Sequence, residues 1–153
     1  MIRQYIIHNF KNHADTSLKL GGLTILTGIN GMGKSSVFQS MLILRESYLR
    51  RPSMELLSLD GESFSVGNSA GLVNRSVKTN GDLLRLGMIT DDGNVQFSYR
   101  YPVGDENEMA ASEDGIHTET DQLRRIPLFN DDFQYLCAFR MGPQAVYQSH
   151  TGV

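Results

Sequence analysis

Cysteine and long apolar runs are what this chain has least of. Its single cysteine, Cys137, cannot form an internal disulfide, which fits a reducing compartment. No apolar stretch is long enough to cross a bilayer, and the first five residues, Met1–Tyr5, lack a signal-peptide pattern. Metal-ligand spacing is also missing from the four histidines, His8, His13, His117 and His150. With 40% hydrophobic residues among 153, the sequence predicts one globular cytoplasmic domain with no membrane contact.

Basic residues are absent from one long segment, between Tyr101 and Leu123. That segment holds seven of the 17 acidic residues: Asp105, Glu106, Glu108, Glu113, Asp114, Glu119 and Asp121. Ten acidic residues and all 14 basic ones lie elsewhere, so the rest of the chain is positive and compatible with nucleic-acid contact. Because it is charged and poor in large apolar residues, the acidic segment is predicted to be a solvated, mobile loop over residues 103–123.

One motif in the chain carries recognisable chemistry. Residues 28–35 read Gly-Ile-Asn-Gly-Met-Gly-Lys-Ser and match the phosphate-binding pattern G-x-x-x-x-G-K-[ST] in full. The apolar, β-branched run Leu23–Thr27 precedes it and predicts a buried parallel strand. Apolar residues at helical spacing over Ser35–Leu49, among them Phe38 and Tyr48, predict the amphipathic helix that should follow, with these aromatic residues in the core. A strand, a glycine-rich loop and a helix in this order predict a P-loop.

The residue types of this loop suit ATP and Mg²⁺. Glycines allow backbone N–H groups to approach a polyphosphate, and the helix N-terminus favours the anion. Lys34 can reach the β- and γ-phosphates, and the Ser35 hydroxyl can ligate Mg²⁺. The nucleotide-contacting residues predicted from the loop and the first helical turn are Gly28, Asn30, Gly31, Gly33, Lys34, Ser35 and Ser36.

The rest of the chain is rich in predicted β-structure. Two strands, over 1–10 and 16–20, should pair antiparallel. Asp60-Gly61 and Asp91-Asp92-Gly93 should each turn a hairpin, one over 55–66 and one over 84–101. A buried strand is expected over Phe133–Phe139.

The order of these elements resembles the ABC-type ATPase heads of the SMC, RecF and OLD group, most closely bacterial AAA-family ATPases related to OLD nucleases. The matching stretches are Asn9–Lys11, Gly28–Ser36, Met41–Arg45, 59–67 and Arg140–Pro143. The resemblance implies an α/β P-loop NTPase fold: the N-terminal half of a head, with a mixed sheet and a β-rich antiparallel subdomain. Its parts would be residues 1–52, 53–102, 103–123 and 124–153.

The resemblance also implies roles for individual residues outside the loop. Lys11 and Asn12 would approach the nucleotide from the side, although they could equally form a plain surface turn. Gln144 would be the Q-loop glutamine that touches Mg²⁺ and the attacking water, and the alternative is an ordinary loop residue. Lys34 and Gln144 are thus the catalytic candidates, and Ser35 and Gln144 are the metal-ligand candidates.

Three features of such heads are not found in the sequence: a signature segment, a strand ending in Asp-Glu, and a switch histidine. We therefore expect the N-terminal half of a longer ATPase. It would need its C-terminal half or a second head, and the complete protein would couple ATP hydrolysis to DNA processing in repair or anti-phage defence. Two alternatives remain: a small stand-alone P-loop kinase, for which Asp131-Asp132 is the only tempting acidic pair, and a non-catalytic, nucleotide-dependent interaction module.

Overall fold

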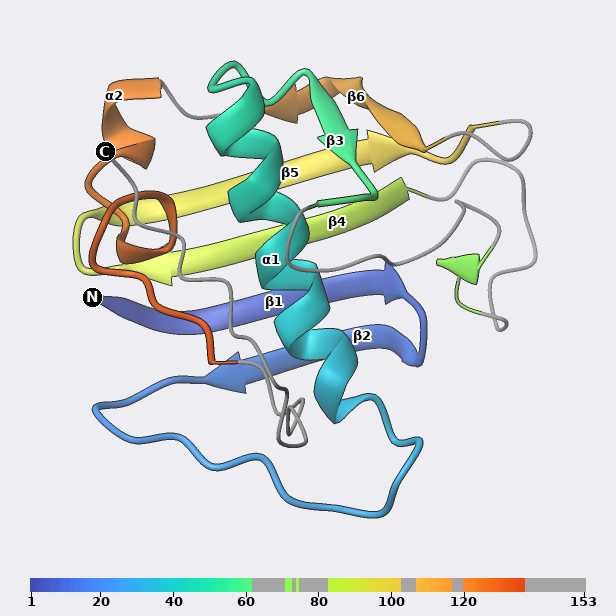
Figure 1. Cartoon of the computed structure of the whole chain (residues 1–153), viewed down its shortest axis with the longest axis vertical. Helices are drawn as coiled ribbons and strands as arrows, with labels where there is room; N and C mark the ends of the chain where they lie inside the picture. Colours follow the sequence, from blue (N-terminus) through green and yellow to red (C-terminus); the bar gives the residue numbers. More distant parts are fainter. Residues whose placement is uncertain (62–70, 73, 75–82, 103–106, 117–119, 137–153) are drawn as a thin grey trace, which may run out of the picture.

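The centre of the molecule is a six-stranded sheet with the strand order β2-β1-β4-β5-β6-β3 (Figure 1). This computed structural model describes residues 1–61, 71–72, 74, 83–102, 107–116 and 120–136. The strands are β1 Ile2–Phe10, β2 His13–Lys19, β3 Leu56–Ser58, β4 Leu83–Thr90, β5 Gly93–Arg100 and β6 Glu108–Ile116. Within these ranges every strand pairs antiparallel with its neighbours. The helices are α1 Lys34–Arg50, the short α2 Thr120–Leu123 and the 3-10 turn η2 Pro127–Phe129.

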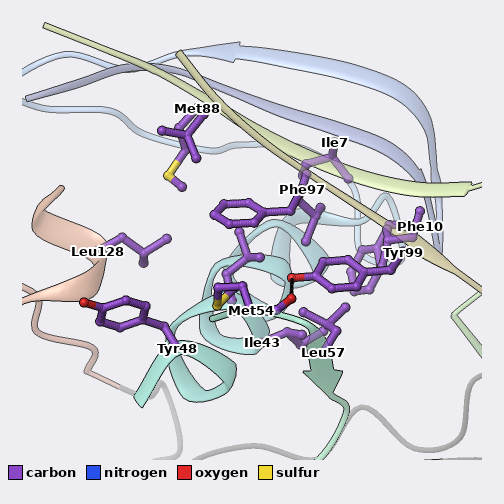
Figure 2. Packing of buried hydrophobic residues seen from close by; sticks show 14 of the residues in the cluster. Ile7, Phe10, Ile43, Tyr48, Met54, Leu57, Met88, Phe97, Tyr99 and Leu128 are labelled. Carbon is purple, nitrogen blue, oxygen red and sulfur yellow. Dashed lines mark hydrogen bonds between the residues drawn. The ribbon is translucent and has the colours of Figure 1, made fainter. Parts of the chain in front are cut away.

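Helix α1 crosses one face of the sheet, and the core lies between them (Figure 1). Its residues Ile43 and Leu44 are fully buried, and the Tyr48 ring lies 4.9 Å from that of Phe129. From the sheet, Phe97 and Tyr99 point into the same cluster, and the Tyr99 hydroxyl donates to the Met54 carbonyl oxygen at 3.1 Å (Figure 2). The predicted helix is therefore confirmed to within a residue at each end.

Two predicted pairings of strands are confirmed. β1 and β2 form the first, with Ile7 opposite Thr16. β4 and β5 form the second around Asp91–Gly93, where Gly93 takes φ of 139°, a value that L-residues with a side chain rarely adopt. Their inward face is the predicted alternating one, with buried side chains at Leu84, Leu86, Met88, Val95, Phe97 and Tyr99.

The prediction of a buried parallel strand over Leu23–Thr27 is wrong for this structure. The segment has no regular secondary structure, and it runs beyond β2 before it turns back to α1 (Figure 1). Leu23 is 84% exposed and Ile25 is 72% exposed. An apolar run forms a buried strand only when neighbouring strands offer hydrogen-bond partners. The described strands pair with one another and none pairs with this segment.

The prediction of a loop over the acidic segment is wrong for Glu108–Ile116, which forms β6. This strand lies between β5 and β3, pairing Ala111 with Tyr99 and Leu57 with Met109. Met109 is fully buried, while Glu113 is exposed beside Arg100. Glu108 and Glu113 thus reach solvent from a strand whose buried Met109 faces the core.

Several other predictions are only partly covered by the described residues. β3 is present, but the second arm of its predicted hairpin, 62–66, lies outside them, and so do residues 137–139 of the last predicted strand. Residues 133–136 are irregular, and Leu136 is 91% exposed. The parallel pairing that a mixed sheet requires is not seen among the described strands. None of the helices in the described part is long and apolar enough to cross a membrane.

Candidate nucleotide-binding site

The P-loop connects the irregular segment 23–27 to the first residue of α1. Three of its glycines have positive φ: Gly28 at 144°, Gly31 at 85° and Gly33 at 91°. A Cβ at Gly28 or Gly31 would meet no atom within 4 Å. Backbone conformation, rather than crowding from within the chain, therefore requires glycine at these two positions, and the space beside them is open to a ligand.

Helix α1 begins directly behind this loop, with Gly33 as its N-cap residue. The Gly33 carbonyl oxygen accepts hydrogen bonds from the backbone N–H groups of Ser36 at 2.9 Å and Val37 at 3.2 Å. Glycine offers no side-chain cap, and the first turn contains no acidic residue. The positive end of the helix dipole is thus not offset by a carboxylate of its own first turn, which favours an external anion.

The Lys34 side chain folds back over the loop. Its Nζ donates hydrogen bonds to the carbonyl oxygens of Gly28 at 2.7 Å and Ile29 at 2.9 Å. The Lys34 ammonium therefore lies at the mouth of the loop and is partly exposed. From there its hydrogen bonds could pass from the two carbonyl oxygens to a phosphate oxygen. Asn30 and Ser35 are exposed beside it, and Ser36 is partly buried.

The turn between β1 and β2 lies against the loop and the helix. Lys11 Nζ donates to Gln39 Oε1 of α1 at 2.9 Å, and partial burial lowers the pKa of Lys11. Asn12 Nδ2 donates to the Gly31 carbonyl oxygen. The structure thus brings both predicted side residues to the P-loop, where each is already engaged with protein atoms.

Sequence reasoning missed His13, which follows this turn directly as the first residue of β2. His13 is buried, and its Nε2 lies 3.0 Å from the Gly33 carbonyl oxygen. The signal that could have found His13 is its position directly after Lys11 and Asn12 in the sequence. Metal-ligand spacing, which His13 lacks, is not a test for a hydrogen bond of this kind.

Hydrogen bonds from residues far away in the sequence hold this turn in place. Asn9 is fully buried with φ of 60°, and its Oδ1 accepts from the Asn74 backbone N–H at 3.3 Å. The Lys11 N–H donates to the Leu72 carbonyl oxygen at 2.7 Å, and Asn74 Nδ2 donates to the Lys11 carbonyl oxygen at 2.7 Å. The Tyr101 hydroxyl donates to the Asn9 carbonyl oxygen.

Not every predicted residue joins this site. Gln144 lies outside the described residues. Arg45, which ends one of the stretches that carry the resemblance, is engaged in the fold: its guanidinium donates to the carbonyl oxygens of Leu128 and Asn130, each at 2.8 Å, and lies over the Phe133 ring. Asp131 and Asp132 are exposed, and the Asp132 N–H closes a local turn with Asn130 Oδ1 at 2.9 Å.

Comparison with curated proteins supports a relationship to ABC-type, SMC-like ATPases. The relative in question is the DNA double-strand break repair Rad50 ATPase of Archaeoglobus fulgidus, to which the chain is 26% identical over 106 residues. The match covers 62% of this chain and 12% of that protein. No protein-family model matches the chain, and no solved structure matches it.

Proposed function

We propose that this chain is the ATP-binding N-terminal half of an SMC/RecF/OLD-like ATPase. The observation that carries the proposal is the complete P-loop pattern at residues 28–35, placed directly before α1 with Lys34 at its mouth. The similarity to a Rad50 ATPase supports the same class. Because that relative is a DNA double-strand break repair protein, we assign the complete protein to DNA processing, in repair or defence.

The residues present fit a Mg²⁺–nucleotide. Positive-φ glycines leave open space beside the loop, and the helix N-terminus and Lys34 supply positive charge. With a nucleotide bound, the backbone N–H groups of the loop would bind the phosphates, Lys34 would contact the β- and γ-oxygens, and the exposed Ser35 hydroxyl would hold the metal ion. Mg²⁺ would neutralise charge that builds on the phosphates.

Binding is tested by titrating residues 1–153 with a fluorescent ATP analogue in the presence of Mg²⁺. Lys34→Ala should weaken binding by tenfold or more, because it removes a charge-assisted hydrogen bond to phosphate. Lys19→Ala is the matched control, since Lys19 is an exposed lysine on β2 and should leave the affinity unchanged. Equal affinity of wild type and Lys34→Ala would overturn the proposal.

Hydrolysis by this chain alone should be feeble. The P-loop positions phosphates, whereas hydrolysis in this class also needs a carboxylate that orients water and a signature segment from a second head. We expect phosphate release near background, rising when the C-terminal half or a complete head is added. Turnover on the order of 1 per second, abolished by Lys34→Ala, would instead favour a stand-alone enzyme.

A further inference from the structure

Three consecutive side chains, two from the β1–β2 turn and one from the start of β2, contact the phosphate-binding loop and helix α1. Lys11 reaches α1 at Gln39, Asn12 reaches the carbonyl of Gly31, and His13 reaches the carbonyl of Gly33. Of the three, His13 is the most buried, at 8% exposure. It is also the one whose contact falls on the N-cap residue of α1.

The contact with Gly33 places a proton on Nε2 of the His13 ring. A carbonyl oxygen can only accept, so the contact of 3.0 Å to the Gly33 oxygen requires a proton on Nε2. Nδ1 lies 2.9 Å from the Thr16 hydroxyl, which can donate or accept. Thr16 therefore orients the ring from within β2, with Nε2 directed at Gly33.

Steric fit makes the same contact specific to glycine at position 33. A Cβ there would lie 2.8 Å from His13 Nε2 and 3.3 Å from Asn12 Cβ. The imidazole thus fills the space that a side chain at residue 33 would need. It contacts the P-loop glycine whose carbonyl also accepts from the N–H groups of Ser36 and Val37 in the first turn of α1.

We propose that His13 is a positioning residue for phosphate binding, holding the Gly33 carbonyl so that the first turn of α1 presents its N–H groups to the nucleotide. The inference rests on the proposed function. Segment 23–27, on the other side of the loop, is unpaired with any described strand. Asn12 and His13 therefore support the loop at Gly31 and Gly33, and His13 transmits that support to the helix N-terminus.

The experiment compares glutamine and asparagine at position 13, whose side-chain amides differ in their distance from the backbone. Glutamine carries its side-chain N–H₂ near the position of histidine Nε2, whereas asparagine carries it near Nδ1. His13→Gln should retain affinity for the fluorescent ATP analogue within about threefold. His13→Asn should lose about tenfold, the scale of one lost hydrogen bond that orients a binding group. His8→Gln and His8→Asn, at a half-exposed position of β1, should both bind as wild type.

Amide hydrogen exchange supplies a readout that does not need nucleotide. His13→Asn should speed exchange at Ser36 and Val37, His13→Gln should not, and the last turn of α1 should be unaffected in both.

Unchanged exchange in both variants would overturn the inference even if ATP binds. Failure of wild type to bind the analogue would overturn the proposed function and the phosphate role of His13. Equal loss in both variants, with lowered melting temperature, would show a role in folding alone.

Discussion

At the scale of single residues, the turn beside the site depends on two residues with unusual backbone conformation. Asn9 and Lys11 both have positive φ, a conformation that asparagine tolerates better than most residues. The Asn9 amide then uses both of its ends, accepting from the Asn74 N–H and donating to the Leu83 carbonyl oxygen at 3.4 Å. A residue distant from the nucleotide therefore determines the shape of the turn that supports the P-loop.

Asn9→Ala should destabilise the fold by about 1–3 kcal/mol, because it leaves buried partners of the amide without a hydrogen bond and strains the positive φ. Urea unfolding followed by circular dichroism measures this change. Asn94→Ala, at an exposed position of β5, is the control and should stay within about 0.5 kcal/mol of wild type. A variant at Asn9 as stable as the control would show that the buried network contributes nothing.

At the scale of elements, sequence patterns predicted the helix and the hairpin whose formation depends on residues close together in the chain. The helix after the P-loop and the hairpin at Asp91–Gly93 follow from residues close in sequence, and both are present. Segment 23–27 could not be predicted in the same way, because an apolar run specifies a strand only if partners exist for its backbone. β6 was missed because three of its nine residues are acidic and large apolar side chains such as Met109 are few.

The faces of α1 give a direct test of helix packing. The sequence pattern assigned Phe38 to the buried face, yet it is 45% exposed, whereas Ile43 is fully buried. Ile43→Ala should therefore cost about 2–5 kcal/mol of unfolding free energy, from lost apolar burial and the cavity left behind. Phe38→Ala should cost well under half as much. Equal losses in chemical denaturation would contradict the packing of α1 on the sheet.

β6 can be tested by removing one ladder donor. The Ala111 N–H donates to the Glu55 carbonyl oxygen at 2.9 Å. Ala111→Pro removes that donor inside the sheet, so it should cost at least about 1–3 kcal/mol and lower the melting temperature. Ala111→Ser keeps the N–H and is the control. If residues 108–116 were instead a solvated loop, proline and serine variants would melt at the same temperature as wild type.

At the scale of the whole molecule, most of the exposed large apolar side chains of the described residues lie in irregular segments outside the sheet. Leu23, Ile25 and Leu136 are among the most exposed large hydrophobic residues. Single exposed apolar residues are ordinary, but an extended segment with several of them and no paired strand favours association.

We expect residues 1–153 to self-associate at high concentration through segment 23–27. Replacing Leu23 and Ile25 together by Lys should weaken association at least tenfold in sedimentation velocity, since it removes apolar contact area and adds charge repulsion. Melting should barely change, because neither side chain is in the core. Thr24→Lys adds a charge on the same segment without removing apolar surface, and it should have a smaller effect. Association that persists in the double variant would place the contact elsewhere.

The anchoring of the β1–β2 turn also sets an order of assembly during synthesis. The P-loop and its helix leave the ribosome early, but the groups that fix the turn against them come from Leu72, Asn74, Leu83 and Tyr101. Contacts so far apart in sequence form only after the intervening chain has closed. A nascent chain that ends before residue 101 therefore carries a complete phosphate-binding motif on an unfinished support. Nucleotide affinity should be acquired late in translation, well after the motif itself has been made.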